Sequence, residues 1–312
     1  MNRSVWIDTD LGFDDLAAVL TVMHTPGWQV AGLSLVAGNA PLPVVIDNAL
    51  RSAAFFKWTM PIHAGHAQPL ACELVTAQNI LGEDAMVSAG RQLPRTRTGL
   101  ASDDGVSALA AFLENSDAPA TVLALGPLTN FAALLLARPE LARRIGMLMW
   151  MGGSAGPGNH TAAAEFNAAV DPEAVQHVLD ANTPLHMVGL DACRQVRVHS
   201  ADAQALRDIG TEAGLILGDL LLGYVRIASP DGSLPMSLYD PTAAAALVAP
   251  AGMQFRDAHI ASELKGEHTR GMTVVEFRVP RRAVANARVA STAEEAMLRD
   301  VVLGALMRAA KA

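Results

Sequence analysis

Residues 4–24 read SVWIDTDLGFDDLAAVLTVMH, and this stretch decides the fold. Ser4 to Ile7 is a short apolar run typical of a strand, and residues 14–24 form an apolar, alanine- and leucine-containing segment typical of a helix. The turn between them holds four aspartates within eight positions, from Asp8 to Asp15. A strand that passes through an acidic turn into a helix begins a βα repeat, which indicates an α/β protein.

The alternation of strands and helices continues along most of the chain. Further strands are predicted at residues 30–36, 62–64, 121–125, 147–151 and 185–188, and further helices at 43–59, 106–115, 128–136, 172–181 and 201–209. Continuous apolar strands separated by helices predict a mostly parallel central sheet that is covered by helices on both faces. We therefore expect a single Rossmann-like α/β domain over residues 1–312.

The last third of the chain has a different pattern. Residues 259–264 and 272–277 flank the turn sequence KGEHTRG, which predicts a small C-terminal antiparallel hairpin. A helix is predicted from Thr292 to the C-terminus. The segment from Gly90 to Gly105 is rich in Pro, Gly and Arg, and is the one obvious long loop; a lid or a surface excursion explains it equally well.

Composition limits the classes of partner. The chain has 312 residues, 51% of them apolar, and a net charge of −8, which disfavours a nucleic-acid or anionic membrane partner and favours a small molecule. The N-terminus leaves no room for a signal peptide, and no window has the length of a membrane-spanning helix. Cys72 and Cys193 form no zinc or redox motif, which fits a reducing compartment. We expect a cytoplasmic protein.

The aspartate cluster after the first strand predicts a metal site. One aspartate is explained by helix capping, but four neighbouring carboxylates repel one another unless a cation compensates them. Ligands that are all oxygen indicate a hard ion, and flexible coordination by carboxylates and carbonyls favours Ca²⁺. The motif alone also fits a phosphatase whose first aspartate is the nucleophile, so other segments have to decide.

Polar groups follow the later strands as well. They occur at Gly38-Asn39, at residues 126–130 (GPLTN), in the run from Met151 to Glu173, and at Tyr239-Asp240-Pro241. Parallel sheets bind ligands at the C-terminal ends of their strands, so these groups are candidate binding residues. Within the long run, Asn159, Glu165 and Asn167 suit a polyhydroxylated ligand, although loop capping explains them too.

Taken together, these segments resemble the inosine-uridine-preferring nucleoside N-ribohydrolases, the nucleoside hydrolase family. The resemblance covers nearly the whole chain: DTDLGFDD at 8–15, GN at 38–39, PIHAG at 61–65, LGPLTN at 125–130, GNHTAAAEFNAAVDPEA at 158–174 and ELKGEHTRGMTVVE at 263–276. It implies the nucleoside hydrolase fold and disfavours the phosphatase, because that family's later lysine and acidic motifs have no counterpart here. It also implies a homodimer or homotetramer.

The resemblance assigns residues at the sugar end of the site. It implies that Ca²⁺ is held by Asp10, Asp15, the carbonyl of Leu125 and Asp240, with Asp8 orienting its neighbours. It assigns the ribose to Asp14, Asn39, Met151, Asn159, Glu165 and Asn167. The implied reaction is hydrolysis of the N-glycosidic bond of a ribonucleoside through an oxocarbenium-like transition state, in which Asp10 takes the proton of the attacking water.

The leaving-group end departs from the family pattern. Many members carry a histidine just before the Asp-Pro and another before the glycine near position 82, whereas this chain has Tyr239 and Leu81. Three readings remain open from the sequence. In the first, Tyr239 donates a proton to the departing base. In the second, Tyr239 or Tyr224 stacks on the base, and in the third the substrate is another N-ribosyl compound. A non-catalytic, Ca²⁺-dependent ribosyl-binding protein is a further alternative, against which the intact Asp10 argues.

Overall fold

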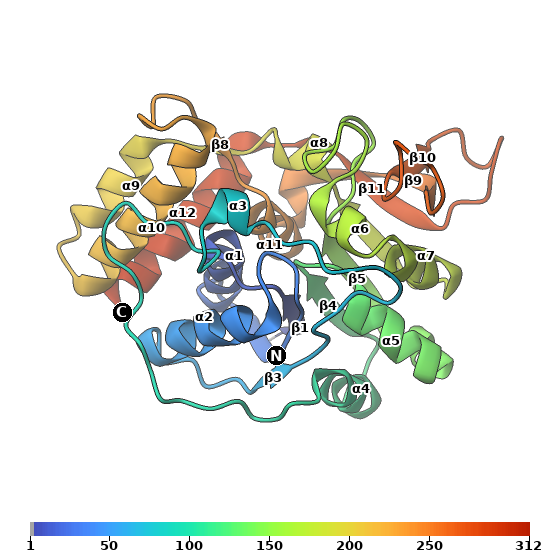
Figure 1. The fold of residues 1–312 in the computed structure, drawn as a ribbon, viewed down its shortest axis with the longest axis horizontal. Helices are drawn as coiled ribbons and strands as arrows, with labels where there is room; N and C mark the ends of the chain where they lie inside the picture. The colour runs from blue at the N-terminus through green and yellow to red at the C-terminus, as the bar shows by residue number, and fades with distance from the viewer. Residues whose placement is uncertain (1–2) are drawn as a thin grey trace.

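The computed structural model describes residues 3–312 as a mostly parallel sheet with helices on both sides (Figure 1). The strands of the main sheet are β1 (Arg3–Thr9), β2 (Trp28–Leu35), β3 (Ile62–Ala64), β4 (Ala120–Ala124), β5 (Ile145–Met151), β6 (Leu185–Val188), β9 (Met253–Ser262), β10 (Thr273–Glu276) and β11 (Ala287–Ala293). Their order is β10-β9-β11-β6-β5-β4-β1-β2-β3. All neighbours pair in parallel except β10 with β9 and β9 with β11, so the predicted fold class is confirmed.

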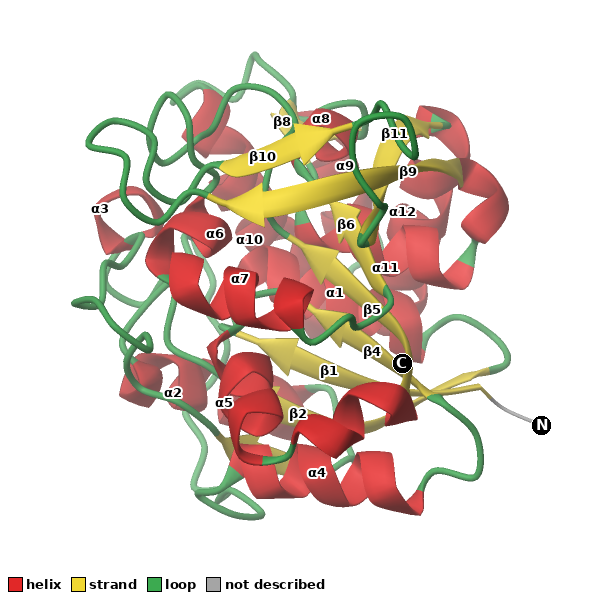
Figure 2. Ribbon diagram, turned by 90° about the vertical axis from the view of Figure 1, so that its right-hand side faces the viewer, coloured by secondary structure: helices red, strands yellow, loops and turns green. Residues whose placement is uncertain are grey.

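Helices cover the two faces of the sheet. They are α1 (Phe13–Met23), α2 (Leu42–Phe55), α3 (Gln78–Leu81), α4 (Gly105–Asn115), α5 (Thr129–Ala137), α6 (Phe166–Val170), α7 (Pro172–Asp180), α8 (Leu190–Cys193), α9 (Ser200–Arg207), α10 (Glu212–Ala228), α11 (Asp240–Val248) and α12 (Glu295–Lys311). Two 3-10 turns, η1 (Pro139–Arg144) and η2 (Pro250–Gly252), and a small ladder of β7 (Arg197–Val198) with β8 (Met236–Ser237) complete the structure. In Figure 2, α4, α5 and α7 lie in front of the sheet, with α1, α11 and α12 behind it.

The alternation of side chains along the strands builds a core on each face. In β1, Val5 and Ile7 belong to the core shared with α1, α11 and α12, whereas Trp6 belongs to the core shared with α4, α5 and α7. Successive residues of a strand point to opposite faces of a sheet, so an apolar strand has to be buried on both. This requirement explains why the strands read as continuous apolar runs.

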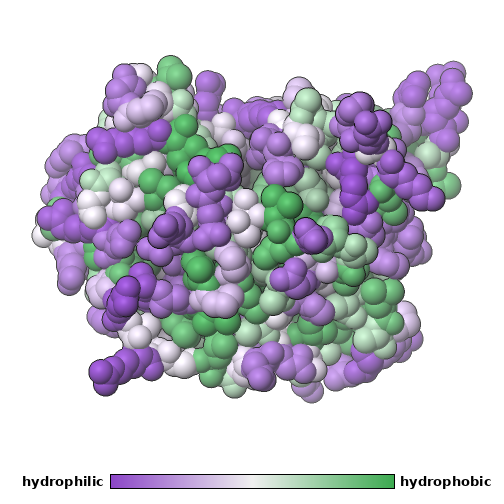
Figure 3. All heavy atoms as spheres, viewed as in Figure 1, coloured by the Kyte–Doolittle hydropathy of each residue, from purple (hydrophilic) through white to green (hydrophobic). Residues whose placement is uncertain are grey.

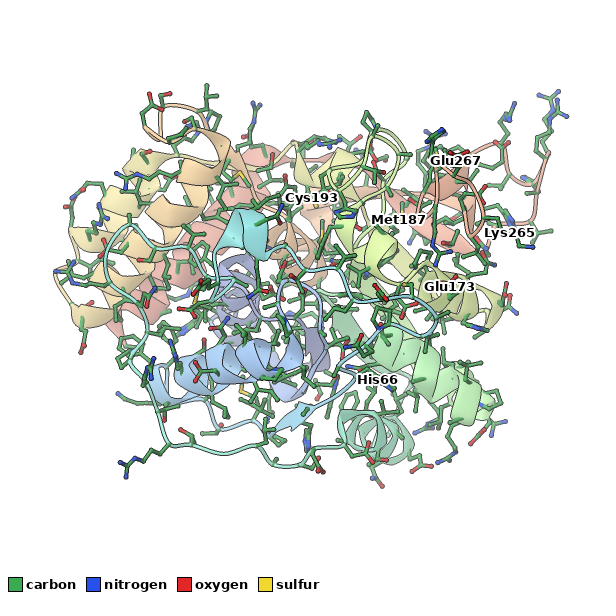
Figure 4. The ribbon with its side chains drawn as sticks, viewed as in Figure 1. His66, Glu173, Met187, Cys193, Lys265 and Glu267 are labelled. Atoms are coloured by element: carbon green, nitrogen blue, oxygen red, sulfur yellow. The ribbon has the colours of Figure 1, made fainter. Side chains whose placement is uncertain are left out.

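The predicted C-terminal hairpin is present, and it extends the main sheet. β9 pairs with β10 in antiparallel register, from Thr273 opposite Ser262 to Glu276 opposite His259, and β9 also pairs with β11. An ion pair between Arg270 and Glu173, which is labelled in Figure 4, joins the hairpin to α7. The helix predicted from Thr292 begins only at Glu295, because Thr292 and Ala293 still belong to β11 and pair with β9.

The chain between β3 and α4 runs over the C-terminal edge of the sheet with little regular structure. Only α3 and an isolated bridge between His63 and Ser102 interrupt it within the described residues. Asp219 of α10 fastens this segment, because its Oδ2 accepts hydrogen bonds from the backbone and the guanidinium of Arg91 at 2.8 and 3.1 Å. No helix among residues 3–312 is long and apolar enough to cross a membrane.

Candidate active site

A cavity of about 600 Å³ opens at the C-terminal edge of the sheet, where the strand arrows of Figure 2 end. It is lined by Asp10, Asp14, Asn39, Val75, Thr76, Ala77, Asn79, Ile80, Leu81, Leu125, Met151, Asn159, His160, Glu165, Phe166, Asn167, Tyr224, Ile227, Met236, Tyr239 and Asp240. The site residues that the sequence predicted therefore face one cavity, with the exceptions of Asp8 and Asp15, which are fully buried. The structure thus brings together segments that lie more than two hundred residues apart in the chain.

Three carboxylates converge at the floor of the cavity. Asp14, Asp15 and Asp240 each offer an oxygen, and these oxygens lie within 4.8 Å of one another. Asp14 and Asp15 stand in the first turn of α1, and Asp240 is the first residue of α11, which packs against α1. The N-terminal turn of a helix favours a negative charge, but it cannot compensate three carboxylates at this distance.

Asp10 lies beside this cluster with one oxygen lacking a hydrogen bond. Its side chain is 1% exposed; Oδ2 accepts a hydrogen bond of 2.6 Å from the backbone of Asn39, while Oδ1 is buried without a partner. The close approach depends on Gly38, since a Cβ at that position would stand 2.2 Å from Oδ2 of Asp10. Buried polar atoms nearly always have partners, so the free Oδ1 points to a missing ligand.

The electrostatics of the cluster also favour a cation. Burial and the nearby charge of Asp15 raise the pKa of Asp10 and of Asp240 well above the ordinary range, and the same two causes raise the pKa of Asp14 to about 7. The residues that line the cavity include neither lysine nor arginine. Buried carboxylates without a basic partner, with oxygen as the sole donor type, fit a hard metal ion.

Asp8 supports the floor from below without reaching the cavity. Its carboxylate is fully buried, and Oδ1 accepts hydrogen bonds from Ser34 and, at 2.7 Å, from Nδ2 of Asn130. Burial raises the pKa of Asp8 to about 7 despite these donors. The structure thus places Asp8 one layer behind Asp10, between the ends of β2 and α5.

Asn167 joins the ends of two strands. Its Nδ2 donates to the carbonyl oxygens of Leu125, at 2.7 Å, and of Met151, at 3.0 Å, which lie directly after β4 and at the end of β5. These bonds fix the direction of the Leu125 carbonyl and use one of its two lone pairs. The other amide atom of Asn167, Oδ1, has no hydrogen-bond partner among residues 3–312.

Glu165 shapes the loop that precedes Asn167. Its carboxylate caps α6, accepting hydrogen bonds from the backbones of Gly153 (2.7 Å), Asn167 (2.9 Å) and Ala168 (3.0 Å). Burial raises the pKa of Glu165 to about 7, and these donors oppose the shift. Asn159 holds the other end of the loop, because its Oδ1 accepts from the backbone of Phe166 at 2.9 Å. Both residues therefore have a structural part besides lining the cavity.

Tyrosines and apolar side chains complete the cavity, and Tyr224 lies close enough to Asp14 for its hydroxyl to lower the pKa of that carboxyl by a hydrogen bond. Tyr224 is 3% exposed, and its hydroxyl donates to the carbonyl of Ser237 at 2.8 Å. Tyr239 is partly buried, and burial raises its pKa to about 12. Leu81, the last residue of α3, also lines the cavity.

The sequence missed most of this apolar wall. Val75, Ile80, Ile227 and Met236 come from the loop before α3, from α3, from the end of α10 and from β8. Val75 and Ile80 are 47% and 57% exposed, and hydrophobic patches between hydrophilic side chains are visible on the same face in Figure 3. Ordinary apolar side chains on separate elements form no motif, and only the tertiary structure brings them together.

A profile of the inosine-uridine preferring nucleoside hydrolase family matches residues 5–300. The chain belongs to this family. This nucleoside hydrolase is 35% identical over 280 residues to the pyrimidine-specific ribonucleoside hydrolase RihA of Salmonella paratyphi C, a match that covers 89% of both chains. RihA of Shewanella woodyi is 36% identical over 279 residues, which are 88% of this chain and 89% of that one.

Solved structures agree with the fold of this nucleoside hydrolase. A purine-preferring ribonucleoside hydrolase from Gardnerella vaginalis superposes with a TM-score of 0.90 at 22% identity, covering 99% of both chains. Family membership identifies the protein as a glycosidase that hydrolyses ribonucleosides to ribose and base. The non-catalytic, ribosyl-binding alternative is therefore not favoured.

Proposed function

We propose that this nucleoside hydrolase is a Ca²⁺-dependent N-ribohydrolase in which Asp10 accepts the proton of the attacking water. The observation that carries the proposal is the buried, unpartnered Oδ1 of Asp10 beside three converging carboxylates. A free carboxylate oxygen held against a cavity is suited to take a proton from a water bound there.

The ion would be held by Asp10, Asp15, Asp240 and the carbonyl oxygen of Leu125. The fit rests on donors that are all oxygen and on the second lone pair of the Leu125 carbonyl, which its bond to Asn167 leaves free. When bound, the ion supplies a positive charge that acidifies a water and offsets the clustered carboxylates. Asn39 assists from the protein side, because its backbone and its Nδ2 bind Asp10 and Asp15 at 2.6 and 3.3 Å.

The ribose would lie between the carboxylates and the loop before α6. Asp14 accepts hydrogen bonds from sugar hydroxyls in this proposal, and Asn39, Asn159, Glu165 and Asn167 surround the ring, with the side chain of Met151 against it. Support comes from their common cavity and from the free Oδ1 of Asn167. Negative charge around the sugar stabilises the cationic ring as the glycosidic bond breaks.

The base would occupy the apolar end. The pKa of Tyr239, raised to about 12, favours a contact and hydrogen-bonding role over that of proton donor for this phenol, and the hydroxyl of Tyr224 already donates to Ser237. Both rings are then available to pack against a base. The likeness to hydrolases named pyrimidine-specific supports uridine and cytidine as the first substrates to test.

The proposal also covers the partner, the location and the oligomeric state of the enzyme. A net charge of −8 and a cavity of about 600 Å³ favour a small-molecule nucleoside over nucleic acid as the partner. We propose a homodimer or homotetramer, as the sequence resemblance implies, and a cytoplasmic location, which the cysteine usage typical of a reducing compartment supports. Sedimentation analysis of the purified chain tests the oligomer.

The test is release of free base, followed by chromatography. Uridine, cytidine, inosine, adenosine, 2′-deoxyuridine and nicotinamide riboside are incubated with the enzyme in Ca²⁺, in chelator, and in chelator followed by excess Ca²⁺. We expect release from pyrimidine ribonucleosides that chelation abolishes and Ca²⁺ restores, and that Asp10→Ala lacks. Turnover that is unaffected by exhaustive chelation would contradict the proposed metal dependence. If no base is released from any of the six compounds, the proposed reaction is wrong.

A further inference from the structure

His160 is the one histidine, among residues 3–312, that lines the cavity. It lies in the loop between β5 and α6, and its ring meets the ring of Phe166 edge-on, with centroids 5.6 Å apart. Phe166 lines the cavity as well, so the pair forms part of its wall. The ring of His160 is solvent-exposed and can exchange protons with water between turnovers.

The loop holds His160 in place by its own hydrogen bonds. The backbones of Asn159, His160 and Thr161 all donate to the carbonyl of Ala164, at 3.2, 3.1 and 3.2 Å. The hydroxyl of Thr161 accepts from the backbones of Ala163 and Ala164 at 3.2 and 2.9 Å. A histidine on a backbone fixed in this way keeps its position relative to the cavity, as a residue that contacts substrate requires.

Charged groups reach the cavity from several elements around His160. The carboxylates are Asp10 and Asp14 after β1, Glu165 at the start of α6 and Asp240 at the start of α11, and the phenols are Tyr224 and Tyr239. Arg194 stands outside the lining and binds the loop from behind, donating to the carbonyls of Pro157 and Gly158 at 3.0 and 2.9 Å. Burial raises the pKa of both phenols, which makes them poorer proton donors. His160 supplies the one imidazole among the lining residues, and an imidazole is the side chain suited to proton transfer near neutral pH.

We propose that His160 protonates the departing base. This inference rests on the proposed function, and assigns the proton donor that the replacement of two histidines by Tyr239 and Leu81 leaves open. The bond between C1′ and the base nitrogen breaks, and its electron pair goes to the base. The imidazolium of His160 gives its proton to the base, water adds to C1′, and the proton of that water goes to Asp10. Asp10 then releases its proton to solvent, and solvent returns a proton to His160.

The experiment compares two leaving groups. Uridine needs a proton on its base, whereas a riboside of 4-nitrophenol leaves as a stable phenolate without one. We expect His160→Gln to lower kcat/KM for uridine by about 10–100-fold and to change the rate on the nitrophenyl riboside by less than about threefold. The alkaline fall of the uridine pH profile, where wild type loses the imidazolium, should disappear in the variant. His160→Ala should regain part of its uridine activity in added imidazole.

His177→Gln serves as the matched control, because His177 is an exposed histidine on α7 that does not line the cavity. It should behave as wild type on both substrates. Equal losses of His160→Gln on uridine and on the nitrophenyl riboside would overturn the proposal, since a merely structural role lowers both. An unchanged pH profile and rate on uridine would overturn it as well. If wild type cleaves neither compound, the proposed function itself falls, and this inference falls with it.

Discussion

The two ends of the cavity are built in opposite ways. At the sugar end, carboxylates from the ends of β1 and the starts of α1 and α11 stand close enough to raise one another's pKa. At the other end, apolar side chains from α3, α10 and β8 form the wall, and His160, on the loop before α6, is the one imidazole among the described residues that line the cavity. At the first end, close carboxylates repel one another. The second end presents an apolar surface.

The difference separates the chemistry from the choice of substrate. Every ribonucleoside presents the same ribose, so the groups that act on it belong on the rigid strand ends at the centre of the sheet. Bases differ in size and polarity, and the elements that contact them are peripheral: α3 is a single turn within a long, irregular segment. Mutations at the sugar end should therefore abolish turnover, whereas mutations at the base end should change kcat/KM for particular bases by smaller factors.

Asp10→Asn is the substitution with the largest expected effect. It keeps the shape of the side chain and its bond from Asn39 but removes the basic oxygen, so kcat for uridine should fall by about 10³-fold. The fold should survive, because a buried charge is being neutralised rather than created. Initial rates together with far-UV circular dichroism measure both effects.

Asp300→Asn is the matched control, since Asp300 is an exposed aspartate on α12. It should retain the wild-type rate within about twofold, as surface substitutions usually have little effect. Retention of a tenth or more of the activity by Asp10→Asn would show that another group accepts the proton, and would weaken the contrast between the two ends.

The pH dependence of the metal-free protein gives the next effect. Burial raises the pKa of Asp8 and of Asp14 to about 7, well above the value near 3.8 expected in the unfolded chain. A raised carboxyl pKa contributes stability at low pH that is lost as the pH rises through the folded value. In chelator, Tm should therefore fall between pH 5 and pH 8, by an amount on the order of 5 °C.

Calcium should oppose this loss, because it binds the ionised carboxylates of the folded state. Differential scanning calorimetry in chelator and in Ca²⁺ tests both expectations. The increase in Tm on adding Ca²⁺ should be larger at pH 8 than at pH 5. A metal-free Tm that rises over this range would mean that the buried carboxylates are compensated by groups of the protein itself.

The convergence of the N-terminal aspartates could be predicted from the sequence because they belong to one motif. The run DTDLGFDD keeps four aspartates at the junction of one strand and one helix, and βα alternation tells which edge of the sheet they occupy. The sequence could not show that Asn167 spans Leu125 and Met151, or that Glu165 caps α6, since both depend on how separate loops approach. It also missed β11, whose short, mixed sequence becomes a strand only beside β6 and β9.

Tyr239→Phe measures how far the phenol takes part in leaving-group departure. Because the pKa of Tyr239 is about 12, its hydroxyl is a poor acid at neutral pH, and the variant should lose less than about fivefold in kcat/KM for uridine. Its pH profile should keep the alkaline limb that His160→Gln lacks. A loss of a hundredfold or more, together with disappearance of that limb, would make Tyr239 the proton donor in place of His160.

Ile80→Ala should have the smallest effect and tests the base end most directly. Ile80 lines the cavity yet is 57% exposed, so its truncation removes apolar contact with a base and hardly changes the protein core. The lost contact should raise KM for uridine by about threefold and leave kcat unchanged, because binding is weakened equally in the ground state and the transition state. Steady-state kinetics on uridine and inosine separate the two constants. If kcat falls instead, α3 helps to orient the scissile bond, and the two ends of the cavity are less independent than their construction indicates.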